Sequence, residues 1–178
     1  MTQDEINLKE IILPHDLALI EDAWPEIWAM VERHPFSEQI QFLLANQDLS
    51  RKKVLNIRRE MSEPNCIGTA LFVAGLSPLG YPYHGLSVEL GQHMKEDDGL
   101  SLAQMIWHCT VERRRPGVFI FSHCGESDDW HAGIYVGQIG NEHIAFAQHG
   151  RGRPFGFESI RQNYADAQYY TPSTLAKE

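Results

Sequence analysis

The chain has 178 residues, 43% of them hydrophobic and 22% charged, which is the composition of an ordinary globular protein with enough length for one core. Its formal net charge of -9 disfavours sequence-independent binding to nucleic acid, and no apolar run approaches the length of a membrane span. Three cysteines without paired spacing favour a reducing compartment over a disulfide framework. We therefore expect one domain over residues 1–178 that binds neither nucleic acid nor a membrane.

The first five residues contain acids where a secretory signal would contain lysine or arginine. No apolar segment with a small-residue cleavage site follows them. The expected location is the cytoplasm, with export by a route that needs no signal peptide as the alternative.

Residues 1–64 are predicted to form a helical prefix. Apolar residues recur on one stripe over 16–31, and Pro25 should fall at a helix start or a kink. Ser37 is a candidate N-cap for a second helix, and a third is predicted over residues 52–60.

A short apolar helix is predicted between Asn65 and Gly75, which are good capping residues for its two ends, and Cys66 would be its first helical residue. A thiol in that position faces backbone N–H groups and the positive end of the helix dipole, which favour the nucleophilic thiolate. The same N–H groups can hold the oxyanion that forms when a carbonyl is attacked. The alternative is that Cys66 is simply a small buried hydrophobe.

Residues 76–97, rich in Gly, Pro and Tyr, are interpreted as a loop, and a helix is predicted over about 101–111. Strands follow at 118–121, 131–136 and 144–147, with a short helix near 158–163 and a last strand at 167–170. Helices followed by strands predict an α+β fold with a small antiparallel sheet.

His131 opens the second of these strands and is the candidate base for Cys66. Alternation places its side chain on the face opposite Ala132 and Ile134. Gly133, on the same face as His131, would leave room for another element, such as a helix end that carries a thiol. The alternative is a surface histidine or one with an ordinary hydrogen bond.

Three segments, in this order, resemble signatures of the NlpC-type cell-wall peptidases. They are Asn65-Cys66-Ile67-Gly68, Pro116-Gly117-Val118-Phe119-Ile120-Phe121 and His131-Ala132-Gly133-Ile134-Tyr135-Val136-Gly137. The resemblance covers about residues 65–170. It implies a papain-like core over 65–178, with the Cys helix packed on the antiparallel sheet, Cys66 as nucleophile and His131 as general base.

Four positions depart from that family's pattern. Asn65 replaces the usual acid, Ile67 a Ser, Thr69 an aromatic residue and Val118 an Asp. The loss of that acid and of that Ser concerns substrate contacts more than the nucleophile.

A third residue should orient the imidazole, and in the family it is polar and lies on the strand after the His strand. Gln148 and His149 are the candidates, with His143 if the turn is tighter, and His149 is our choice. Tyr83, Trp130 and Gln148 are candidate substrate-binding residues. The group of His and acidic residues around Cys124 matches no metal-ligand spacing, so we predict neither a metal nor a cofactor.

The predicted function is therefore that of a cysteine peptidase or amidase that hydrolyses a peptide amide bond through a thioester. The resemblance suggests a peptide substrate of the muropeptide type. The alternatives are an acyltransferase or a glutamine deamidase that uses the same Cys and His, or a binding module without turnover. The oligomeric state and the role of the prefix stay open at this point.

Overall fold

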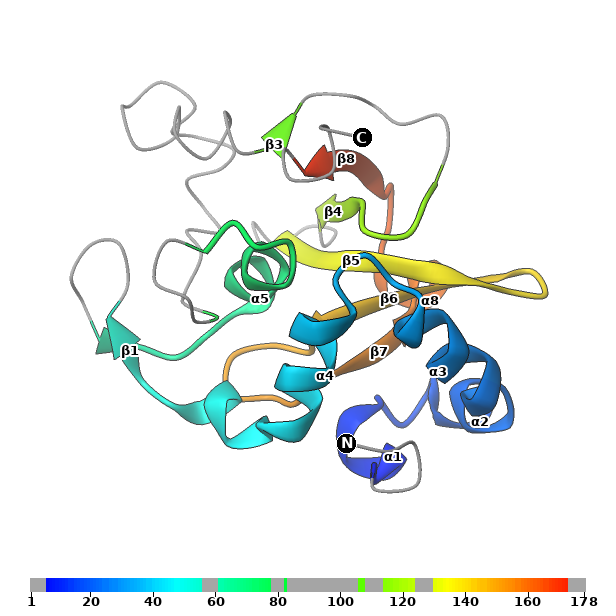
Figure 1. The fold of residues 1–178 in the computed structure, drawn as a ribbon, viewed down its shortest axis with the longest axis horizontal. Helices are drawn as coiled ribbons and strands as arrows, with labels where there is room; N and C mark the ends of the chain where they lie inside the picture. Colours follow the sequence, from blue (N-terminus) through cyan, green and yellow to red (C-terminus); the bar gives the residue numbers. More distant parts are fainter. Residues whose placement is uncertain are drawn as a thin grey trace.

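The computed structural model describes residues 6–55, 61–77, 82, 106–107, 114–123 and 130–172. Within these residues the helices come first and an antiparallel sheet follows, so the α+β class predicted from the sequence is confirmed (Figure 1). In this part of the chain no helix is long and apolar enough to cross a membrane.

The prefix is mainly helical, as predicted, but its helices are shorter than expected. Residues 16–31 form two helices that meet at Ala23, and Pro25 falls at the start of the second helix, as predicted, where its missing N–H costs little. Ser37 is the first helical residue of its helix rather than the N-cap, a position that Phe36 occupies. The elements are α1 (Leu8–Ile11), α2 (Leu17–Asp22), α3 (Trp24–Glu32), α4 (Ser37–Ala45) and the 3-10 helix η2 (Gln47–Arg51).

Two predicted helices are wrong where the structure describes them. Strand β1 (Val54–Leu55) lies within the helix predicted over 52–60, and it pairs with β2 (Met61–Ser62), which directly follows that range. Strand β3 (Ile106–Trp107) lies within the helix predicted over 101–111. Isoleucine, valine and tryptophan favour extended backbone, and pairing decided the outcome, with a nearby strand for β1 and a distant strand for β3. The remaining residues of both segments, and most of the loop predicted over 76–97, lie outside the described residues.

Six strands form the main sheet in the described part of the chain, in the order β3-β8-β4-β5-β6-β7, and every neighbouring pair is antiparallel. The strands predicted at 118–121, 131–136, 144–147 and 167–170 are confirmed, and β7 is an edge strand that the sequence analysis missed. The short helix predicted near 158–163 begins two residues later, at Ile160. The bounds are β4 (Phe119–His123), β5 (Trp130–Ile139), β6 (Glu142–Gln148), β7 (Phe155–Ser159), α8 (Ile160–Asn163) and β8 (Gln168–Pro172).

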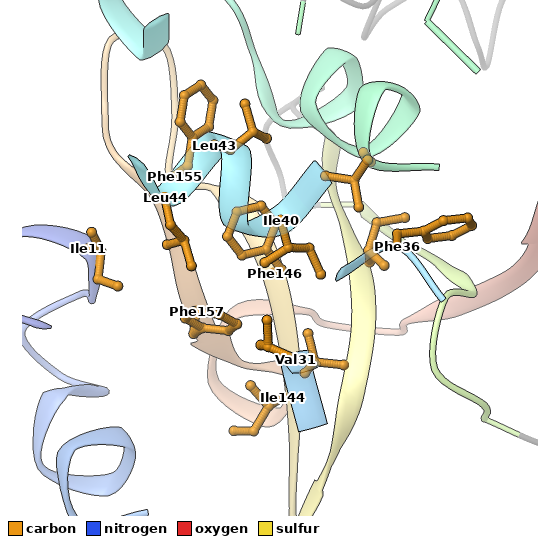
Figure 2. Close-up of a cluster of buried hydrophobic side chains, with 14 of the residues drawn as sticks. Ile11, Val31, Phe36, Ile40, Leu43, Leu44, Ile144, Phe146, Phe155 and Phe157 are labelled. Carbon is orange, nitrogen blue, oxygen red and sulfur yellow. The ribbon is translucent and has the colours of Figure 1, made fainter. Parts of the chain in front are cut away.

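The larger hydrophobic core lies between the prefix and one face of the sheet. Side chains of α3 and α4, among them Val31, Ile40 and Leu43, pack against Phe146 and Phe157 from β6 and β7 (Figure 2). Helix α5 (Cys66–Val73) joins the same cluster and packs on β5 and β6. A smaller cluster covers the other face of the sheet and includes Ile120, Ala145 and Tyr164. The prefix and the sheet therefore share one core.

Candidate active site

The site begins at the amino end of α5, where Cys66 is the first helical residue, as predicted. Asn65 caps the helix, because its Oδ1 accepts a hydrogen bond from the backbone N–H of Gly68 at 2.9 Å. At the other end Gly75 has φ +70°, and the N–H of Leu76 bonds to the carbonyl of Leu71 at 2.8 Å, so the helix ends in a Schellman motif. Both caps fix the position at which the helix starts.

Helix α5 lies beside β5 (Figure 1). Cys66 at the start of the helix is hydrogen-bonded to His131, which lies near the start of β5. Burial lowers the pKa of His131, but the charge of Glu158 and hydrogen bonds to Cys66 and Glu158 outweigh it and hold that pKa well above its ordinary value. Cys66 is 8% exposed, and the His131 side chain is 16% exposed. The thiol is therefore buried, and the imidazole is only partly accessible to solvent.

Glu158, on β7, is the residue that orients His131. Its Oε1 lies 2.6 Å from His131 Nε2, and its side chain is 1% exposed. Because Nε2 faces the carboxylate, Nδ1 is the ring nitrogen left for the thiol. Burial alone would raise the pKa of Glu158, but the charges and hydrogen bonds of His131 and His149 hold it far below its usual range, so the group is a carboxylate.

Tyr164 holds the same carboxylate from the segment after α8. Its hydroxyl donates to Glu158 Oε1 at 2.5 Å, and its ring lies 4.7 Å from the His131 ring, centroid to centroid. A Cβ at Gly133 would lie 2.3 Å from this hydroxyl. Gly133 thus leaves room on the face of His131, as the alternation predicts, but Tyr164 fills that room rather than a helix end.

His149 was chosen from the sequence as the residue that orients His131. In the structure Glu158 lies between the two histidines, so His149 contacts Glu158. Its Nδ1 lies 3.0 Å from Glu158 Oε2, and its Nε2 lies 3.1 Å from the backbone carbonyl oxygen of Ile11. The correction has a simple cause: β7 follows β6 in the sheet and carries an acid directly between the two histidines. His143, the other alternative, instead bonds to the hydroxyl of Tyr135 at 2.8 Å.

Gln148 does not lie where a substrate could touch it. It is completely buried, and its side chain accepts from Thr69 Oγ1 and donates to the carbonyl of Ser50, each at 3.2 Å. Its strand position turns it toward α5, so it ties that helix to the sheet. Trp130 opens β5 next to His131, and Tyr83 lies outside the described residues.

Sequence reasoning missed Glu158 because it assigned that residue to a helix. A signal was present: Phe155, Phe157 and Ser159 alternate with Gly156 and Glu158, as in a strand with an acid on one face. All five residues are buried, however, and a uniformly buried strand is hard to tell from a helix without its partners.

No family model, no curated protein and no solved structure was found to match the chain. Within the described ranges, no group of three His, Cys, Asp or Glu side chains is arranged to hold a metal ion. What the arrangement offers is a thiol at a helix start, an imidazole hydrogen-bonded to it, and a buried carboxylate behind the imidazole.

Proposed function

We propose that the chain is a cysteine hydrolase that cleaves a peptide amide bond, with Cys66 as nucleophile, His131 as general base and Glu158 as the orienting residue. The observation that carries the proposal is the continuous path from Cys66 through His131 to a buried carboxylate. The order of groups is that of a nucleophile, base and acid triad. The raised pKa of His131 favours an imidazolium, which in turn favours the thiolate beside it.

The reaction proceeds in two steps. The sulfur of Cys66 attacks the carbonyl carbon, His131 holds the thiol proton, and backbone N–H groups at the start of α5 stabilise the oxyanion. When the C–N bond breaks, His131 gives that proton to the leaving amine and a thioester remains on Cys66. Water, deprotonated by His131, then attacks the thioester, which releases the carboxylic acid and restores the thiol. Glu158 keeps Nε2 protonated and the ring in place throughout.

A papain-like fold of the NlpC type is part of the same proposal. Two features support it. Helix α5 packs on an antiparallel sheet, and the cysteine lies at the start of that helix while the histidine lies near the start of a strand. Peptides of the muropeptide type are the substrate class that the resemblance over residues 65–170 suggests. The prefix lies outside the resemblance, so it supplies no argument about the substrate.

Selective alkylation tests whether the thiol is activated. We expect iodoacetamide near pH 6 to label the peptide that contains Cys66 at least about tenfold faster than those with Cys109 or Cys124, because the imidazole of His131 beside the sulfur favours the nucleophilic thiolate. The other two cysteines act as internal controls in the same digest. Uniform slow labelling would favour a binding module without turnover.

Product analysis tests the reaction itself. The wild type and Cys66→Ala are incubated with a panel of short peptides that includes muropeptide-like ones, and the products are identified by mass spectrometry. We expect hydrolysis by the wild type and none above background by Cys66→Ala. Products that appear only with an added amine or acyl acceptor indicate acyl transfer, and conversion of glutamine to glutamate indicates deamidation.

A further inference from the structure

The two hydrogen bonds of His149 define its protonation. The carbonyl of Ile11 can only accept, so His149 Nε2 must carry a proton. Glu158 is a carboxylate and can also only accept, so His149 Nδ1 must carry a proton as well. A histidine whose two ring nitrogens both donate is an imidazolium, and the side chain of this one is 2% exposed.

The geometry points to His149 as a positioning residue: a buried imidazolium that fixes the second oxygen of Glu158 and links the active site to the main chain of the prefix. This inference rests on the proposed function. His149 does not contact the reacting atoms in this arrangement, because Glu158 and His131 lie between it and Cys66.

The proposed positive charge of His149 offsets the negative charge of Glu158 in the site. The groups joined in this chain are Cys66 from α5, His131 from β5, Glu158 from β7 and Tyr164 after α8, and α1 presents an uncharged carbonyl. With His149 positive, Glu158 is neutralised on one side, and a thiolate and imidazolium pair at Cys66 and His131 brings the total to zero. Without that charge, the carboxylate would oppose formation of a second anion at Cys66.

The prefix holds Ile11 in place along the outer edge of β7. Ile12 forms a parallel bridge with Phe157, and a Cβ at Gly156 would lie 1.5 Å from the carbonyl oxygen of Ile11. Glycine at 156 is therefore what lets the prefix come so close to β7 and present that carbonyl to His149.

Two further contacts occupy the same edge. The side chain of Gln47 bonds to both backbone groups of Phe155, at 2.8 and 2.9 Å, and the buried Asp16 accepts from the N–H of Ser159 at 3.1 Å. Together with the Ile12 bridge, they reach every second residue of β7, on the side away from β6. Three parts of the prefix are thus held against β7, the strand that carries Glu158.

The direct test reads the protonation of His149 in the unmodified protein. Two-bond and three-bond ¹H–¹⁵N correlation spectra of ¹⁵N-labelled wild type at pH 7 report whether each ring nitrogen carries a proton. The spectrum of His149→Gln assigns the signals by their loss, and that of His15→Gln, whose side chain is 51% exposed, serves as a control. We expect both nitrogens of His149 to be protonated. A neutral ring with one protonated nitrogen would overturn the inference whatever the protein catalyses.

The second test asks whether the charge of His149 acts on Cys66. The rate of iodoacetamide labelling of Cys66 is measured from pH 4 to 9 in the wild type, His149→Gln and His15→Gln. Loss of a positive charge two groups away should move the acidic limb of the His149→Gln profile upward by about one pH unit. His15→Gln should follow the wild type. If the acidic limb of the labelling profile is the same in His149→Gln as in the wild type, His149 has only a packing role and the inference is overturned.

Gly156→Ala provides a variant that changes no titratable group. The added methyl must displace Ile11, so we expect the acidic limb to move in the same direction as in His149→Gln and by a smaller amount. Two results would refute the link between His149 and the prefix. One is an acidic limb that moves in the opposite direction, and the other is an unmoved limb in a Gly156→Ala protein that unfolds at the same temperature as the wild type. If Gly156→Ala does not fold, the spectrum of the wild type still decides the inference. Absence of a reactive Cys66 in the wild type would instead refute the proposed function.

Discussion

Two histidines approach the carboxylate of Glu158 from opposite sides, and their second partners differ. His131 lies on Oε1 at 2.6 Å and also bonds to Cys66, whereas His149 lies on Oε2 at 3.0 Å and also bonds to a backbone carbonyl of the prefix. The same residue type on the same acid is suited to chemistry on one side and to support on the other. The second partner, rather than the histidine itself, decides which.

The pH behaviour of the reactive side follows from the directions of two shifts. The pKa of His131 is raised in the folded state, so its contribution to stability is complete below about 6.5 and is lost as the pH rises through the folded value. The pKa of Glu158 is lowered, so its contribution is present above about 4.5 and is lost as the pH falls. Both shifts favour the ionised pair near neutral pH.

Replacement of Glu158 should have the largest effect, because both histidines lose the shared carboxylate and one of them would face an amide NH2 in place of an oxygen. For Glu158→Gln we expect kcat/KM on the best peptide of the panel to fall by about a thousandfold, since the imidazole loses its orienting charge. The matched control is Glu142→Gln: Glu142 bonds to Ser159 and Arg161, outside the site. A loss smaller than about tenfold in a folded Glu158→Gln would remove Glu158 from the mechanism.

Replacement of Gln47 tests the contacts between the prefix and the outer edge of β7 without changing either histidine. Gln47→Ala leaves the N–H and carbonyl of Phe155 without their partner, so the free energy of unfolding should fall by about 2 kcal/mol. Urea denaturation measures this, and amide hydrogen exchange at Phe155 should become faster. Gln41→Ala is the control, because Gln41 bonds only within its own helix in the described structure, and its effect should stay within about 0.5 kcal/mol. Equal effects of the two variants would contradict the proposed importance of this edge.

His34 offers a third histidine for comparison, one that is buried and neutral. The N–H of Phe36 donates to its Nδ1 and its Nε2 donates to the carbonyl of Tyr135, both at 3.0 Å. Burial lowers its pKa more than the hydrogen bond to Tyr135 raises it. As the pH falls, His34 of the unfolded chain therefore takes up a proton at a higher pH than His34 of the folded protein. Stability should be lost as the pH falls below about 6.5.

The measurement is the free energy of unfolding at pH 6.5 and 5.5 for the wild type and His34→Gln. We expect the wild type to lose up to about 1 kcal/mol more than the variant over this range, since one site contributes at most that order per pH unit. The contributions of His131 and Glu158 cancel in the difference. Parallel losses would show that His34 does not titrate differently in the two states.

The reactive side of the site could be predicted from the sequence because local rules define it. Asn65 and Gly75 delimit a helix, and His131 is the second residue of an alternating strand. Glu158 could not be found in the same way, because β7 is defined by its pairing with β6 and with the prefix rather than by its own composition. For the same reason β3 was predicted as helix: its two residues are extended only because they pair with β8.

The edge contacts of the prefix have a practical consequence for expression of residues 65–178 alone. A fragment that starts at Asn65 would lack Ile12, Asp16 and Gln47 and so leave the outward backbone groups of β7 bare. Phe146 and Phe157, which the prefix covers, would be exposed to solvent next to these backbone groups. A bare edge next to apolar rings is a template onto which strands of other molecules add, so such a fragment would tend to form insoluble fibrils or inclusion bodies rather than a minimal enzyme.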